Sequence, residues 1–182
     1  MQVTPTSLPD VQLVVPKKFG DTRGYFVETW SERTFALHGL ERRWVQDNQS
    51  LSATPGTVRG LHYQLEPDAQ TKLVRVLRGR VLDVAVDIRR GSPTFGRHVA
   101  VELSADGLEQ LFVPAGFAHG FCTLEPDTIV AYKVDAFYSH ERERAILWND
   151  PALGIGWPAV AGTVVSGKDA AAPALAAAVD LF

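Results

Sequence analysis

Short runs in which every second residue is apolar recur along most of the chain. In an extended strand alternate side chains face the same way, so residues 81–88 (VLDVAVDI) have an odd-numbered face and an even-numbered face. Turn signals such as Arg78-Gly79 separate these runs. Roughly eight to ten short strands at this spacing predict an antiparallel sandwich or barrel. The predicted strands include residues 11–15, 25–30, 73–76, 81–88, 98–103, 111–113 and 129–134.

Helix signals are few. Ser31 is a suitable N-cap for a short helix that ends at Gly39. The alanine-rich tail after residues 166–169 (SGKD) is predicted to be helical where it packs on the rest of the chain. The polar residues 46–50 (QDNQS) are predicted to form a loop that also offers amide groups to a ligand. No repeat or linker divides the chain, so residues 1–182 are expected to form one domain.

The stretch 58–72 (VRGLHYQLEPDAQTK) concentrates groups suited to chemistry. Its first half is predicted to be a strand that places His62 among small and apolar neighbours. Imidazole titrates near neutral pH, which suits a general base. The alternative is that His62 is a hydrogen-bonded histidine of the core. The expected face of His62 also holds Val58, Gly60 and Gln64, and the opposite face holds Arg59, Leu61, Tyr63 and Leu65.

Charge and cysteine content narrow the class of protein. The formal charge is −3, with 18 basic and 21 acidic residues, which gives no general electrostatic signal for nucleic acid. Cys122 is the single cysteine, so no internal disulfide forms, and its apolar neighbours predict a buried, inert thiol. The first ten residues lack the pattern of a signal peptide, and no apolar run reaches the ~18 residues of a membrane span. A soluble, cytoplasmic protein is expected.

Several familiar kinds of site are not indicated. A metal site would normally show His-x-His or a close carboxylate, but Gln64 stands two residues after His62 and His119 is distant in sequence. Neither a phosphate-binding glycine loop nor the G-x-S-x-G elbow of serine hydrolases is present. We therefore expect no metal and no phosphate loop.

Proton transfer is the chemistry that remains. His62 would be the base, Tyr132 on a predicted strand the acid, and Lys72 the group that stabilises an oxyanion. These three roles are what proton abstraction beside a carbonyl requires. A carboxylate bonded to the second ring nitrogen would orient His62, and spacing alone leaves Asp83, Asp87 and Asp169 as candidates.

The chain resembles the dTDP-4-dehydrorhamnose 3,5-epimerase family. Matching segments run in order from residue 19 to residue 173. They are FGDTRGYFVETW, VQDNQS, VRGLHYQ, KLVRVLRGRVLDVAVDIRRGSPTFGR, QLFVPAGFAHGF, YKVDAFYSHERE, ILWNDPALGIGWP and SGKDAAAP. The resemblance implies an all-β, antiparallel jelly roll (a cupin-like double-stranded β-helix) with a few short helices, and no cofactor.

The resemblance also implies an activity and a set of roles. The substrate would be dTDP-4-dehydro-6-deoxy-D-glucose, inverted at C3 and C5 to dTDP-4-dehydro-L-rhamnose. His62 would take the proton and be paired with Asp169, Tyr132 would donate a proton, and Lys72 would contact the C4 oxygen. A homodimer is implied, with Arg23 reaching the neighbouring subunit's site. The resemblance implies that Tyr138 stacks on the thymine ring. The residues it implies for substrate binding are Arg23, Phe26, Glu28, Gln46, Asp47, Asn48, Arg59, Lys72, His119, Tyr138, Glu143 and Lys168.

Three alternatives remain at the level of sequence. Relatives of this family include enzymes that invert a single centre on related dTDP-keto sugars. A metal-dependent cupin is a second alternative, and a non-catalytic nucleotide-sugar binding module is a third. The joint presence of His62, Lys72 and Tyr132 speaks against the third, since a binding module needs no pair of base and acid.

Overall fold

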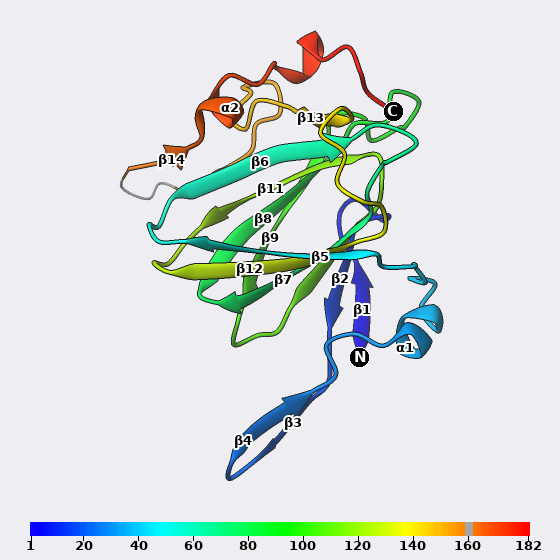
Figure 1. The fold of residues 1–182 in the computed structure, drawn as a ribbon, viewed down its shortest axis with the longest axis vertical. Coiled ribbons are helices and arrows are strands. Elements are labelled where there is room, and N and C mark those ends of the chain that lie inside the picture. The colour runs from blue at the N-terminus through cyan, green and yellow to red at the C-terminus, as the bar shows by residue number, and fades with distance from the viewer. Residues whose placement is uncertain (159–161) are drawn as a thin grey trace.

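Two sheets, antiparallel except for the short parallel pairing of β14 with β6, face one another in the computed structural model, which describes residues 1–158 and 162–182 (Figure 1). Consecutive strands from β5 onward pass repeatedly between the sheets, which is the jelly-roll arrangement expected from the sequence. The first sheet has the order β1 (Gln2–Pro5), β2 (Gln12–Val15), β10 (Gln110–Val113), β7 (Lys72–Arg78), β12 (Thr128–Val134) and β5 (Gln46–Ser52). The second has the order β13 (Glu143–Ala145), β6 (Thr57–Gln64), β11 (Phe117–Thr123), β8 (Arg80–Asp87) and β9 (His98–Ser104), and β14 (Val164–Val165) pairs with β6.

The side chains of β8 alternate with the predicted period of two, and the structure places the two faces in separate cores. Val81 and Ala85 belong to the inner core between the sheets, together with Val74 of β7. Val84 and Val86 belong to an outer core on the far face of the second sheet. Because both faces of the second sheet are covered, its central strands are buried along most of their length.

The two α-helices of the described residues are short, and both have a serine N-cap. Helix α1 (Glu32–Ala36) begins after Ser31 as predicted, and the Ser31 side chain accepts a hydrogen bond from the Thr34 amide. Phe35 of this helix packs on the outer face of the first sheet. Helix α2 (Gly167–Ala170) begins after Ser166, whose side chain accepts from the Asp169 amide.

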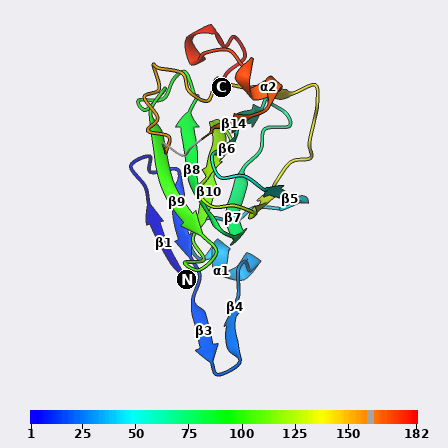
Figure 2. The same ribbon diagram turned by 90° about the vertical axis from the view of Figure 1, so that its left-hand side faces the viewer.

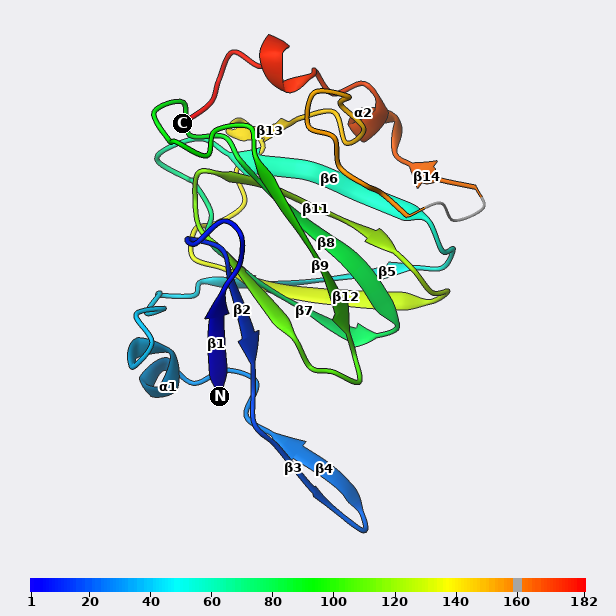
Figure 3. The ribbon, with the colours of Figure 1, turned by 180° about the vertical axis from the view of Figure 1, so that it is seen from behind.

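The prediction of a helical C-terminal tail is confirmed only for a short 3-10 segment. Beyond α2 the tail forms only a 3-10 turn (Leu175–Ala177) and runs over the outer core (Figure 3). Its backbone is bonded to the body instead: the Pro173 carbonyl accepts from the Leu147 amide, and the Phe182 carbonyl accepts from the Arg90 amide. Tertiary hydrogen bonds and packing outweigh the helix propensity of alanine here.

The prediction of a loop at residues 46–50 is wrong, since these residues lie in β5. This strand is at the edge of the first sheet and pairs with β12 alone. A strand at an edge does not need an apolar face, so the apolar alternation that reveals a strand is missing. Strand β11 is another strand that the sequence did not predict, because its residues are almost continuously small or apolar and show no period of two.

The hairpin of β3 (Lys18–Asp21) and β4 (Gly24–Val27) projects away from both sheets (Figure 2). The observed strand β4 begins one residue before the strand predicted at 25–30 and ends at Val27, three residues before its predicted end. Phe19, Tyr25 and Phe26 are exposed on this hairpin, and Phe26 is 69% exposed. Such an aromatic cluster on an otherwise isolated element indicates a contact surface.

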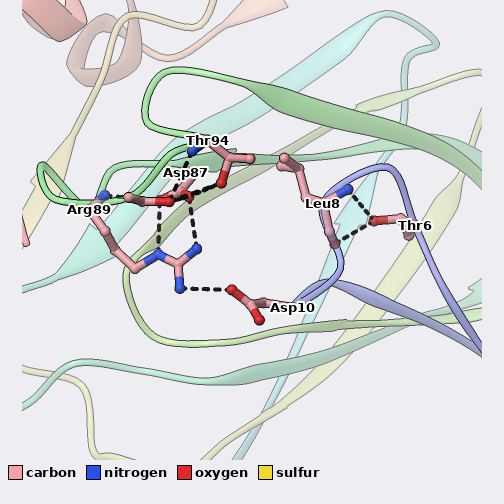
Figure 4. A network of polar contacts seen from close by, with 7 residues as sticks. Thr6, Leu8, Asp10, Asp87, Arg89 and Thr94 are labelled. Carbon is pink, nitrogen blue, oxygen red and sulfur yellow. Dashed lines mark hydrogen bonds and ion pairs between the residues drawn. The ribbon is translucent and has the colours of Figure 1, made fainter.

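A buried carboxylate ties the N-terminal segment to the turn after β8 (Figure 4). Asp87 is fully buried and accepts hydrogen bonds from Arg89 and from the hydroxyls of Ser92 and Thr94. Burial opposes ionisation, but these donors dominate and hold the pKa of Asp87 well below its ordinary value. Arg89 also pairs with Asp10 at 2.8 Å. Asp87 is thereby committed to a structural network and is unavailable to His62.

Candidate active site

A cavity of about 540 Å³ opens between the β5–β12 edge of the first sheet and β6 of the second. Its lining is mixed in charge, with imidazole, ammonium, guanidinium, carboxylate and phenol groups. This composition suits a polar ligand whose protons are to be moved. The lining residues include Ser50, Arg59, His62, Lys72, His119, Tyr132, Glu143, Lys168 and Asp169.

A bulge in β6 brings Arg59 and His62 to this same cavity. His62 lies opposite His119 of β11, but Arg59 lies opposite Phe121, so three steps on β6 match two on β11. The extra residue is Gly60, with φ of +121°. A Cβ there would lie 2.6 Å from the Gly120 Cα, closer than real side chains approach backbone. The prediction that Arg59 and His62 lie on different faces of the strand is therefore wrong. A glycine inside a strand is the sequence signal for such a bulge.

His62 forms a dyad with Asp169. Its Nε2 lies 2.7 Å from Asp169 Oδ1, while Asp169 Oδ2 accepts from the Gly60 amide at 3.2 Å. Burial acts to raise the pKa of Asp169, but the contacts with His62, the Gly60 amide and Ser166 together outweigh burial, and the pKa lies below its ordinary value. Asp169 is thus ionised at neutral pH, so in the neutral imidazole Nε2 carries the hydrogen and Nδ1 has the lone pair that can accept a proton. Of the three candidate carboxylates, Asp83 instead bonds His119 at 2.9 Å.

Tyr132 and Lys72 complete the reactive part of the cavity. Burial raises the pKa of Tyr132, which keeps its hydroxyl protonated at neutral pH. Lys72 is 7% exposed and its Nζ donates to the His62 carbonyl oxygen at 3.2 Å. Burial lowers the pKa of Lys72 to about 8, opposed by the charges of Asp83 and Glu143. A base, a proton donor and a cation therefore surround one space.

An aromatic ring held by polar contacts is joined by a hydrogen bond to Glu143 of the cavity lining. Tyr138 is 53% exposed, its hydroxyl donates to Glu143 Oε2 at 2.9 Å, and its amide donates to Gln46 Oε1 at 3.1 Å. Gln46 in turn donates to Asn48, and Glu143 pairs with Lys168. Burial acts to raise the pKa of Glu143, but contacts with Lys168 and Tyr138 prevail and lower it. Five of the predicted binding residues therefore form one cluster.

Seven of the twelve predicted binding residues do not line this cavity. Gln46, Asn48 and Tyr138 are linked by hydrogen bonds to its lining residue Glu143, and Asn48 also lines a second, smaller cavity. The other four lie elsewhere. Arg23 stands in the turn of the β3–β4 hairpin and pairs with Asp21, and Phe26 lies on β4. Glu28 accepts from the Thr34 hydroxyl beside α1. Asp47 pairs with Lys133 and lines a smaller cavity of about 240 Å³ on the outer face of the first sheet, with Trp30 and Gln110.

Two site features escaped the sequence analysis. Asp83 was considered only as a partner of His62, because nothing in the sequence shows that β8 and β11 pair and bring it to His119. Ser166 caps α2 and so orients Asp169; the S-x-x-D spacing of an N-cap was the signal.

The described residues also bear on three other expectations. Cys122 is buried, and burial raises the pKa of its thiol, which agrees with an inert cysteine. Within residues 1–158 and 162–182 no group of His, Cys, Asp and Glu side chains is arranged to hold a metal ion. In the same ranges, every helix is too short or too polar to cross a membrane.

Comparison with known proteins gives a consistent set of relatives. A family model described as dTDP-4-dehydrorhamnose 3,5-epimerase matches residues 5–177. A protein of that name from Sinorhizobium fredii is 56% identical over 93% of this chain and 87% of its own length. The Bacillus anthracis enzyme of that name, solved with TDP and PPi, is 48% identical with a TM-score of 0.92, covering 95% of this chain and 98% of that one. A Legionella pneumophila 3,5-epimerase in complex with dTDP-4-keto-L-rhamnose is 45% identical with a TM-score of 0.93, covering 97% and 93%.

Proposed function

This chain belongs to the dTDP-4-dehydrorhamnose 3,5-epimerase family, and we propose on that basis that it converts dTDP-4-dehydro-6-deoxy-D-glucose to dTDP-4-dehydro-L-rhamnose. The observation that carries the proposal is the shared cavity of His62, bonded to Asp169, and Tyr132. We treat residues 1–182 as one catalytic domain. A cytoplasmic location is in keeping with a chain that has one cysteine and therefore no internal disulfide.

The proposed chemistry uses the C4 ketone of the sugar. The ketone acidifies the C–H bonds at C3 and C5, and His62 removes one of these protons. The electron pair moves onto the C4 oxygen, where the Lys72 ammonium stabilises the enolate. Tyr132 then delivers a proton to the same carbon from the opposite face, which inverts that centre. Protonated His62 then releases its proton to solvent and the Tyr132 phenolate takes one up. The other carbon reacts in the same way after the sugar ring reorients.

We assign the nucleotide half of the substrate to the polar end of the cavity. The guanidinium of Arg59 and the ammonium of Lys168 suit the diphosphate. The exposed ring of Tyr138 offers a face on which thymine stacks. The residues proposed to contact the sugar, the ribose or the edge of the base are Gln46, Asn48, His119 and Glu143. Their amide, imidazole and carboxylate groups can donate or accept hydrogen bonds.

We further propose a homodimer. Arg23 and Phe26 lie on the projecting hairpin, too far from their own cavity to line it, which fits a role in a neighbouring subunit's site. The exposed aromatic side chains of the hairpin match the partly apolar cavity on the outer face of the first sheet, next to Asp47. Glu28 and Asp47 would then act near this interface. Sedimentation equilibrium should give twice the 19.9 kDa chain mass, and a monomer that is fully active would refute the assignment.

The reaction is tested by isotope exchange. In D₂O, the protein with dTDP-4-dehydro-6-deoxy-D-glucose is expected to introduce deuterium at both C3 and C5, detected by NMR. Label at C5 alone would make it a mono-epimerase, and label at neither carbon would overturn the proposal. A chelator-treated sample serves as control: it should exchange at the same rate, whereas a metal-dependent cupin would lose activity.

The role of Lys72 predicts a pH dependence. Because the pKa of Lys72 is about 8, its ammonium is lost above that pH and kcat is expected to fall there. The Lys72→Met variant should lose about 10²–10³-fold in kcat and should show no fall near pH 8. Rate profiles between pH 6 and 10 on both proteins measure this. If kcat of Lys72→Met still falls near pH 8 as in the wild-type protein, Lys72 is not the group whose deprotonation causes the fall.

A further inference from the structure

Gln64 is a buried polar residue that neither the chemistry nor the lining of the cavity uses. It ends β6, two residues after His62, and is 4% exposed. A primary amide buried without partners is destabilising, so its contacts show what it holds in place. From the sequence alone, Gln64 is notable only because it occupies the position where a metal site would have a second histidine.

All of the amide's hydrogen-bonding groups are used on backbone. Its Nε2 donates to the Asp68 carbonyl at 2.6 Å and to the Phe137 carbonyl at 3.1 Å, and its Oε1 accepts from the Ser139 amide at 2.9 Å. Two carbonyl acceptors and one N–H donor leave a single consistent orientation of the amide. Gln64 is therefore hydrogen-bonded to the backbone of both chain neighbours of Tyr138.

Tyr138 depends on such anchors because its ring is half exposed and belongs to none of the three hydrophobic clusters found among the described residues. Its own hydrogen bonds go to Gln46 and Glu143, both of which are also proposed to contact substrate. Gln64 is buried and faces backbone, so its hold on the segment persists whether or not a ligand is present.

We propose that Gln64 is a positioning residue that fixes Tyr138 as a preformed platform for the nucleotide base. This inference rests on the proposed function. Gln64 lowers the KM of the nucleotide sugar through Tyr138, and it leaves proton transfer by His62 and Tyr132 untouched.

A double-mutant cycle tests this role. Gln64→Met keeps the volume and removes all three hydrogen bonds, and is expected to raise KM about tenfold with kcat within about twofold. In a Tyr138→Ala background the same change should add less than about twofold to KM. Thr128→Val, which removes a buried side-chain-to-backbone hydrogen bond outside the cavity lining, is the control and should leave KM unchanged.

The outcomes separate this inference from the proposed function. Deuterium exchange by the wild-type protein tests the reaction independently. Equal KM effects of Gln64→Met with and without Tyr138 would overturn the positioning role, as would a Tyr138→Ala variant with normal KM. If Gln64→Met does not fold, the Gln64→Glu variant is used instead. Its KM should rise with pH, because the ionised carboxylate is repelled by the carbonyl oxygens of Asp68 and Phe137. A KM that follows the wild-type pH profile would equally overturn the inference.

Discussion

The His62→Ala variant is expected to fold normally and to lose deuterium exchange at both carbons by about 10²–10⁴-fold, the usual contribution of a general base. The imidazole is part-exposed, its side chain is hydrogen-bonded to Asp169, and it belongs to neither core, so its removal leaves both cores intact. Circular dichroism and NMR-detected exchange on the same sample measure fold and chemistry together.

A second histidine provides the control. His98 lies on β9, outside the cavity lining, so His98→Ala should exchange at the wild-type rate. If His62→Ala unfolds, His62 is a core histidine of structural importance. If it folds and still exchanges at the wild-type rate, another group is the base.

The Tyr132→Phe variant is expected to separate exchange from inversion. With His62 intact, a proton is still removed and returned on one face, so solvent deuterium enters with retention of configuration. Without the phenol on the other face, formation of inverted product should fall by about 10²–10⁴-fold. Product configuration by NMR, beside total label, measures the two rates separately.

Tyr63→Phe is the matched control for losing a tyrosine hydroxyl. Tyr63 donates to the Asp180 carbonyl at 2.7 Å in the outer core, and burial raises its pKa to about 12. Its replacement should lower stability by about 1 kcal/mol and leave both rates unchanged. If Tyr132→Phe loses exchange and inversion equally, Tyr132 is not a donor to the second face alone.

The strands with a buried face were predictable because burial imposes a period of two. Residues 81–88 show this most clearly, since each of the two faces of β8 packs in its own core. Strand β5 was missed for the opposite reason: as an edge strand bearing polar residues, it carries no such period. The C-terminal tail was misjudged because long-range hydrogen bonds, which local propensity does not encode, determine its path.

The site was predictable in its residue types but only partly in its geometry. Spacing alone left three carboxylates open for His62, and pairing of distant segments selects Asp169, 107 residues away in sequence. The bulge at Gly60 reverses the expected side of Arg59, because one extra residue changes which side chains share a face. Such features depend on strand register, which the sequence pattern does not specify.

A crystal structure of the protein with a bound dTDP-4-keto sugar tests the central claim most directly. The expected result is a sugar ring lying between His62 and Tyr132, with the imidazole Nδ1 and the phenol oxygen on opposite faces and the C4 oxygen next to the Lys72 Nζ. A ring with both groups on one face, or a Tyr132 hydroxyl directed away from the sugar, would contradict it.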